Sequence, residues 1–140
     1  MDKIYNADGT FYYAKKEYKG EVITSSKTLD ADDSGKVFYV ATDELVITLP
    51  STAANLEYTF INSGADGNNI MTISPAAADG INGTITLAAA IVELSGTVNK
   101  DIINTKASAT TGNTVKLKGT GIAGSAAWMV EYSTGIFASE

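Results

Sequence analysis

The chain of 140 residues contains no cysteine, no histidine and no arginine. Their absence excludes thiolate and imidazole metal ligands, the commonest general base near neutral pH, and the guanidinium fork that recognises phosphate. A net charge of -6 disfavours non-specific binding to nucleic acid, because that binding requires lysine and arginine to neutralise phosphates. The length suits one domain, and we expect a soluble protein without a signal peptide or a membrane-spanning segment.

The first 20 residues differ from the rest of the chain in charge and in aromatic content. They carry four lysines against three acidic residues, a net charge of +1, so the remaining residues carry -7. They also hold four of the seven tyrosines. Asp8-Gly9 is a turn signal, but no sustained helical or strand period follows it. We therefore predict an extended arm over residues 1–27, with room for one short strand, and a separate domain over residues 28–140.

Short strands bounded by turn residues are expected along that domain. Residues 36–41 are rich in aromatic and β-branched side chains, and residues 44–50 end on Pro50, which cannot donate to a ladder. Residues 56–61 and 69–74 alternate between apolar and polar, and further runs follow at 83–96, 100–108, 113–119 and 126–133. We assign Leu87 to Leu94 to a strand although its alanines favour a helix. No repeat of fixed period is found.

The spacing of turn signals determines the predicted fold class. Turn residues recur about every 8 to 12 positions, a pattern typical of all-β sandwiches and barrels, and thirteen glycines punctuate the chain. Parallel α/β folds need long amphipathic helices, and the sequence contains none. The sequence therefore predicts an all-β fold, an antiparallel β-sandwich or jelly-roll-like barrel, with the extended N-terminal arm attached.

The polar loop between the strands at 56–61 and 69–74 raises the question of a ligand site. A calcium loop of the helix-flanked kind beginning at Asp66 would need oxygen ligands at positions five and twelve, but Ile70 and Ala77 stand there. Asp66-Gly67 followed by two asparagines is instead typical of a hairpin turn. Residues 79–83, "DGING", are also predicted to form turns. No metal and no cofactor is expected.

Two acidic clusters are the only sequence basis for a carboxylate-dependent hydrolase. They comprise Asp30, Asp32 and Asp33, and then Asp43 and Glu44. Paired carboxylates are what glycoside hydrolysis requires, but charge runs of this kind usually lie in solvated turns. We expect solvated turns and a protein that is not an enzyme.

Two aromatic features remain. Trp128 alternates with Val130 and Tyr132, which favours a core or interface anchor over a platform for stacking a sugar. The tyrosines of the arm combine large apolar area with a polar tip, which is typical of surfaces that are buried only against a partner. The other interpretation, that Phe11 to Tyr13 form an ordinary edge strand of the domain, stays equally open.

The arrangement of turns and strands resembles that of a known group of proteins. The run "LDADDSGKVFYVATDELVITLPSTAANLEYTFINSGADGNNIMTISPAAADGINGT", followed by "VKLKG" and "AAWMVEYSTG", is similar to the small β-rich modules of tailed-bacteriophage virions. The resemblance covers about residues 28 to 135 and consists of turn chemistry and alternation. Such modules occur in head decoration (cement) proteins and in head or tail fibre proteins, commonly as trimers.

The resemblance implies a non-enzymatic virion structural protein. A chain of one domain and an arm favours a capsid decoration protein on the capsid exterior, which binds the major capsid protein, stabilises the joints between capsid subunits, and forms a homotrimer without nucleic-acid or membrane partners. The capsid-binding arm would comprise Tyr5, Phe11, Tyr12, Tyr13, Lys15, Lys16, Tyr18 and Lys19. The alternative is a phage head or tail fibre domain that acts as a carbohydrate-binding adhesin through Asp66, Asn68, Asn69 and Trp128.

Overall fold

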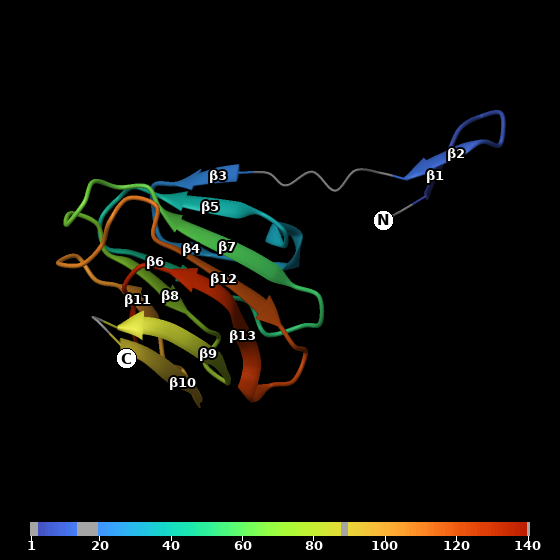
Figure 1. The fold of residues 1–140 in the computed structure, drawn as a ribbon. Helices are drawn as coiled ribbons and strands as arrows, with labels where there is room; N and C mark the ends of the chain where they lie inside the picture. The colour runs from blue at the N-terminus through green and yellow to red at the C-terminus, as the bar shows by residue number, and fades with distance from the viewer. Residues whose placement is uncertain (1–2, 14–19, 88–89, 140) are drawn as a thin grey trace.

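The computed structural model describes residues 3–13, 20–87 and 90–139, which form two packed β-sheets and a separate N-terminal hairpin (Figure 1). The hairpin consists of β1 (Lys3–Tyr5) and β2 (Phe11–Tyr13). The larger sheet has seven strands in the order β10 (Ala90–Val98), β9 (Asp79–Leu87), β13 (Gly124–Thr134), β12 (Thr114–Gly119), β7 (Glu57–Asn62), β5 (Val37–Val40) and β3 (Gly20–Ile23). The smaller sheet has five, in the order β14 (Ala138–Ser139), β11 (Ile102–Asn104), β8 (Met71–Ser74), β6 (Leu45–Thr48) and β4 (Lys27–Thr28).

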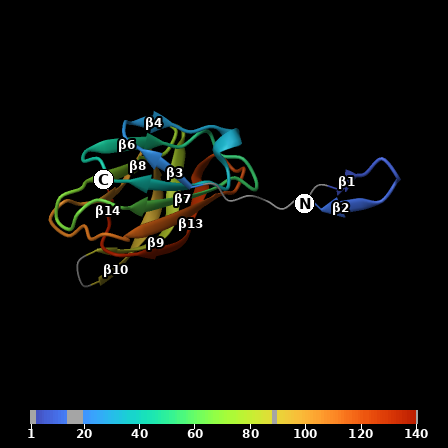
Figure 2. The same cartoon turned by 90° about the horizontal axis from the view of Figure 1, so that it is seen from above.

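The predicted all-β sandwich is confirmed, but its sheets are mixed instead of antiparallel throughout. From β3 to β8 the chain alternates between the two sheets, so that β3, β5 and β7 lie parallel in one and β4, β6 and β8 lie parallel in the other (Figures 1 and 2). Each strand is followed by a strand in the opposite sheet. When the chain returns to the first sheet, it runs in the same direction as before, so neighbouring strands in each sheet are parallel. Most later pairings are antiparallel, whereas β13 and β9 pair parallel.

This winding produces a structural repeat of three coils. Thr28, Thr48 and Ser74 stand side by side in the register of β4, β6 and β8. The ladder continues beyond the strands, where Leu29 N donates to Thr48 O at 2.8 Å and Leu49 N donates to Ser74 O at 2.8 Å. Thr48 follows Thr28 by 20 residues and Ser74 follows Thr48 by 26. Unequal loops between the coils therefore hide the repeat from any search for a fixed period.

The core lies between the sheets and is aromatic at its centre. The rings of Phe38 and Phe60 stack with their centroids 5.6 Å apart, and Tyr58 lies 5.7 Å from Trp128. All four side chains are fully buried, as period-two alternation along β5 and β7 requires. The interpretation of Trp128 as a core anchor is confirmed.

Several local expectations need correction. The predicted hairpin at Asp66-Gly67 is a turn, with Gly67 at a φ of 67°, but β7 and β8 belong to different sheets, so the loop crosses between sheets instead of joining hairpin partners. Residues 79–83 are no turn and lie within β9. Their glycines permit close packing, because a Cβ on Gly80 would lie 2.1 Å from the carbonyl oxygen of Gly96.

Two further segments bear on the predicted boundaries. β9 ends at Leu87 and β10 begins at Ala90, so the strand assignment of the alanine-rich segment is confirmed at its described positions. β3 and β4 pair with β5 and β6, so the sandwich includes residues 20–27, which the sequence pattern places in the arm. No helix in the described part of the chain is long and apolar enough to span a membrane.

Candidate functional site

The N-terminal hairpin is organised by a five-residue turn. Lys3 pairs with Tyr13, Ile4 with Tyr12 and Tyr5 with Phe11. The turn closes where Asn6 N donates to Thr10 O at 2.7 Å, and Gly9 adopts a φ of 86°, the left-handed region that glycine enters without steric cost. The sequence analysis expected one short strand in the arm, but the hairpin contains two strands. Asp8-Gly9 is the turn that joins them.

Asp8 fixes the conformation of this turn. Its Oδ1 accepts hydrogen bonds from the Thr10 hydroxyl at 2.6 Å and from Thr10 N at 2.9 Å. Both bonds favour the ionised carboxyl, and the pKa of Asp8 is lowered chiefly by the hydroxyl bond. The turn is thus held by local polar contacts.

The described apolar side chains of the hairpin are exposed. Tyr5 is 65% exposed, Phe11 47% and Ile4 39%. The Tyr5 and Phe11 rings contact each other, with centroids 5.9 Å apart and planes tilted by 56°, and Ile4 stands at the next register position. The hairpin lies well away from the sandwich in both ribbon views (Figures 1 and 2). Three large apolar side chains therefore gather on a small element outside the core.

The structure describes only some of the residues predicted for the arm. It describes the side chains of Tyr5 and Phe11 and the backbone pairing of Tyr12 and Tyr13. The remaining predicted members, Lys15, Lys16, Tyr18 and Lys19, lie outside the described residues. Phe11 to Tyr13 form the second strand of a separate hairpin, so the alternative that they are an edge strand of the domain is wrong.

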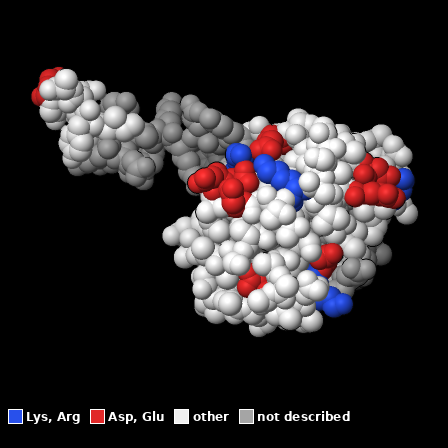
Figure 3. Space-filling model, turned by 180° about the vertical axis from the view of Figure 1, so that it is seen from behind, with Lys and Arg blue, Asp and Glu red and all other residues white. Residues whose placement is uncertain are grey.

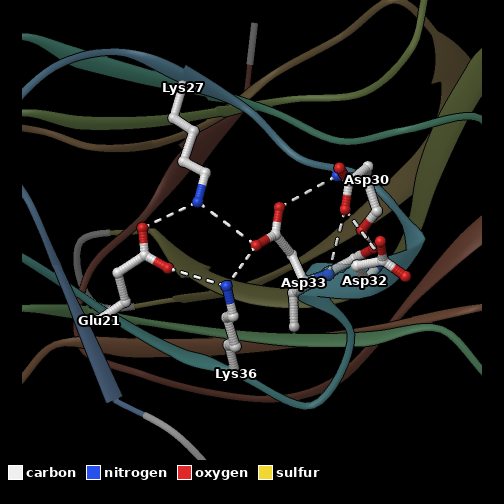
Figure 4. Close-up of polar contacts among 7 residues, drawn as sticks. Glu21, Lys27, Asp30, Asp32, Asp33 and Lys36 are labelled. Carbon is white, nitrogen blue, oxygen red and sulfur yellow. Dashed lines mark hydrogen bonds and ion pairs between the residues drawn. The ribbon is translucent and has the colours of Figure 1, made fainter.

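Where the arm joins the sandwich, four charged side chains from three elements and a turn form one cluster (Figure 4). Lys27 Nζ lies 2.8 Å from Glu21 Oε1 and 3.3 Å from Asp33 Oδ1. Lys36 Nζ lies 2.6 Å from Asp33 Oδ1 and 3.1 Å from Glu21 Oε2. Each lysine therefore bridges the same two carboxylates, one on β3 and one on the short helix η1 (Ala31–Asp33).

The cluster shifts the pKa of each of its members. Hydrogen bonds from Lys27 and Lys36 lower the pKa of Glu21. Burial alone would raise the pKa of Asp33, but hydrogen bonds from Lys36 and from Asp30 N, with the charge of Lys27, lower it overall. The pKa values of Lys27 and Lys36 are raised, chiefly by the hydrogen bonds that they donate to Glu21 and Asp33 respectively. All four groups are therefore charged near neutral pH and compensate one another.

The cluster closes the edge of the sandwich next to the arm. Glu21 pairs with Phe38 in register, and Lys27 Nζ lies 5.4 Å from the centre of the buried Phe38 ring. Charges that point inward at a sheet edge oppose the addition of another strand. Figure 3 shows side chains of both signs gathered on the sandwich where the arm begins. We conclude that the β3 and β4 edge is protected against pairing.

No family model matches the chain, and no curated protein is significantly similar to it in sequence. The likeness to phage virion modules therefore stays a prediction from the residues.

The acidic clusters considered for hydrolysis serve the structure. Asp33 is buried within the lysine cluster, and Asp43 pairs with Lys106 and accepts a 2.7 Å hydrogen bond from Ile70 N. The expectation that both clusters are solvated turns was wrong for Asp33, whereas Asp43 lies partly exposed in a turn and Asp30, Asp32 and Glu44 are exposed. Among the described residues no group of three or more acidic side chains could hold a metal ion.

The residues suggested for a carbohydrate site do not come together on the surface. Trp128 is fully buried, and Asn69 is buried with its Nδ2 donating to Val40 O at 2.9 Å. Asp66 and Asn68 are exposed, and Asp66 accepts a 2.7 Å hydrogen bond from Thr111 N. A stacking platform with adjacent amides is therefore absent from this part of the described structure.

Sequence reasoning missed a buried asparagine network inside the same loop region. Asn62, Asn69, Asn104 and Asn113 are all buried, and their carboxamides are linked by hydrogen bonds. Asn69 was interpreted as a turn residue because asparagine is commonest there, and Asn62 was predicted only as part of the polar loop. The signal that could have marked them is their position: both end or begin alternating strands, at positions where an apolar side chain is the rule.

Proposed function

We propose that the protein is a non-enzymatic virion structural protein, a capsid decoration protein that attaches to the outside of a phage head through its N-terminal arm. The observation that carries the proposal is the exposed aromatic hairpin, in which Tyr5 and Phe11 contact each other away from the core. The major capsid protein is the partner, and the resemblance to decoration modules adds a trimeric assembly on the capsid exterior.

The size of the hairpin favours a binding role. A hairpin of two three-residue strands has no core, and isolated two-stranded hairpins are at best marginally stable in water. Burial of a large apolar side chain contributes about 1.5 to 3 kcal/mol. Burying Tyr5 and Phe11, which share one face of the hairpin, against a partner would therefore stabilise both the hairpin and the complex. The +1 charge of the first 20 residues favours an acidic partner surface.

The sandwich has a protected sheet edge beside the arm, which suits a domain that is held on a surface and must not aggregate. Its arm-side edge is closed by the cluster of Glu21, Lys27, Asp33 and Lys36. On the capsid, the arm would lie across the joint between neighbouring subunits. The apolar area buried there would oppose their separation under the outward pressure of the packaged genome.

The test compares capsid binding by full-length variants. Tyr5→Ser combined with Phe11→Ser removes the ring pair, and Val98→Ser combined with Ile122→Ser removes two exposed apolar side chains of the sandwich as a matched control. Capsids assembled from the major capsid protein of the same genome are sedimented with each protein. We expect binding at least about 100-fold weaker for the arm variant, since a loss of roughly 3 kcal/mol corresponds to that factor, and unchanged binding for the control.

Thermal unfolding followed by circular dichroism would show that the sandwich is intact in both variants. Equal capsid occupancy by the arm variant and the parent protein would overturn the proposal. Equal loss in the arm variant and the control would also contradict it, because the arm would then have no special part in binding.

A further inference from the structure

The side of the sandwich opposite the charged cluster holds a pocket between the two sheets. There β10 ends the larger sheet and β14 ends the smaller one, whereas β3 and β4 end them on the side of the arm (Figures 1 and 2). The pocket has a volume of about 150 Å³ and is lined from both sheets and from the turn between β10 and β11. An apolar cavity of about 150 Å³ holds one benzene molecule, so the pocket has room for a small aliphatic group.

The floor of the pocket is apolar and is supplied by both sheets. Ile81 on β9 and Leu94 on β10 belong to the larger sheet, and Ile102 on β11 belongs to the smaller one. All three side chains are buried members of the core. A ligand that places an aliphatic group against this floor removes apolar surface from water, which is favourable for binding.

The rim of the pocket carries two opposite charges on adjacent residues, Lys100 and Asp101. Asp101 Oδ1 accepts a 2.7 Å hydrogen bond from Ser74 Oγ, and its Oδ2 accepts none from the described residues. Lys100 forms no ion pair within the part of the chain that the structure describes, unlike Lys27 and Lys36. One ammonium group and one carboxylate oxygen therefore remain available for charge-assisted hydrogen bonds to a ligand.

We propose that this pocket binds a free aliphatic α-amino acid of the size of valine. Lys100 binds the α-carboxylate, Asp101 binds the α-ammonium group, and the branched side chain lies on the apolar floor. A simple carboxylate suits the rim less well because Asp101 repels it, and a simple amine suits it less well because Lys100 repels it. The charged groups of the ligand stay at the rim in contact with water, which avoids the cost of burying them. The inference does not rest on capsid binding, because no residue of the arm lines the pocket.

A titration of the full-length protein with L-valine tests this site. The amide resonances of Ser95, Gly96 and Thr97, which line the pocket, report binding in heteronuclear NMR spectra. Three further compounds each lack one of the groups that the pocket is proposed to recognise. Glycine lacks the branched side chain, isovalerate lacks the ammonium group and isobutylamine lacks the carboxylate.

Two variants remove the charges of the rim one at a time. They are Lys100→Gln and Asp101→Asn, and the second keeps an oxygen that can accept from Ser74. Lys118→Gln and Asp32→Asn are the matched controls, because both residues are exposed and neither lines the pocket. Thermal unfolding shows whether each variant is folded. If Asp101→Asn is not, the comparison of L-valine with isovalerate on the parent protein tests the role of Asp101.

We expect saturable shifts with L-valine in the parent protein and in both controls. Binding should be at least about 10-fold weaker for each of the three other compounds and for each pocket variant, since the loss of one hydrogen bond to a charged group, or of one buried aliphatic group, corresponds to about that factor. The absence of a saturable shift up to the solubility limit of L-valine would overturn the proposal. Equal binding of L-valine and isovalerate, or undiminished binding by Lys100→Gln, would also overturn it. Capsid binding should be unchanged in the pocket variants, so the two proposals can fail separately.

Discussion

The side-chain nitrogen Nδ2 of Asn62 lies 2.6 Å from Oδ1 of Asn104, and this hydrogen bond joins the two sheets at one end of the sandwich. Asn62 ends β7 in the larger sheet, and Asn104 ends β11 in the smaller one. Asn104 Nδ2 in turn donates to Asn113 Oδ1 at 3.1 Å and to Ile136 O at 2.9 Å. One buried carboxamide therefore ties together four segments that are distant in sequence.

Asn104→Ala should destabilise the protein by about 2 to 3 kcal/mol, because it leaves one Asn62 amide hydrogen buried without a partner and removes the hydrogen bond to the partly buried Ile136 O. Urea unfolding followed by tryptophan fluorescence measures the effect, since Trp128 is buried in the core. Asn68→Ala, an exposed change in the nearby loop, is the control and should stay within about 0.5 kcal/mol of the parent. A change of that small size for Asn104→Ala would show that the network is dispensable.

The lysine cluster makes stability depend on pH at the acid end. The pKa values of Asp33 and Glu21 are lowered on folding, so their contribution is complete above the ordinary values of 3.8 and 4.5 and is lost as the pH falls through the lower folded values. The pKa values of Lys27 and Lys36 are raised on folding, so their contribution to stability is lost only as the pH rises above 10.5. The contribution of the cluster should therefore be constant between about pH 5 and pH 10.

Asp33→Asn should lower the free energy of unfolding by about 2 kcal/mol at pH 7, because two lysines lose their nearly buried partner. The difference from the parent should shrink as the pH falls below 3.8 through the lowered pKa of Asp33, where the parent's own carboxyl becomes protonated. Urea unfolding at several pH values measures both. Asp32→Asn, at an exposed site of the same helix, serves as control. A difference that stays constant with pH would exclude an electrostatic origin.

Much of the fold is visible in the sequence because alternation and turn residues are local signals. Period-two patterns located β7, β8 and the buried Trp128, aromatic and β-branched composition located β5, and Asp8-Gly9 located the hairpin turn. Sheet membership was beyond reach, because the sequence does not say whether the strand after a loop returns to the same sheet or crosses to the other. For this reason, strands that lie parallel in successive coils were predicted to pair as antiparallel hairpins.

The charged residues show the same limit in another form. Asp33 lies in an acidic run that looks solvated, and its two lysine partners are supplied by β4 and by the turn before β5. Lys36 and Lys27 lie only three and six residues from Asp33, but Glu21, 15 residues from Lys36, joins them when β3 pairs with β5. Alternation and turn signals do not report such ion pairs, whereas the arm was found because its tyrosines and lysines are concentrated in one segment.

Glu44 occupies a conformation that suits glycine better. Its φ is 62°, and a residue with a side chain pays about 1 to 2 kcal/mol in that region. Glu44→Gly should therefore stabilise the protein by about 0.5 to 1 kcal/mol once the added flexibility of the unfolded chain is included. Asn55→Gly, at a φ of 70°, is the comparison and should change stability less, since asparagine tolerates this region. Thermal unfolding would contradict this account if Glu44→Gly lowered the melting temperature.

A side chain at Gly96 should be excluded by a steric clash. Gly112, which has a similar backbone conformation without the clash, is the control for backbone strain. Both have positive φ, 68° and 95°, but a Cβ on Gly96 would lie 2.1 Å from Ser125 O, whereas nothing lies within 4 Å of one on Gly112. Gly112→Ala should cost about 1 kcal/mol through strain alone. Gly96→Ala must also push β10 from β13 and should cost more than about 4 kcal/mol, or prevent folding. Urea unfolding measures both, and similar losses would mean that β10 can shift freely against its neighbours.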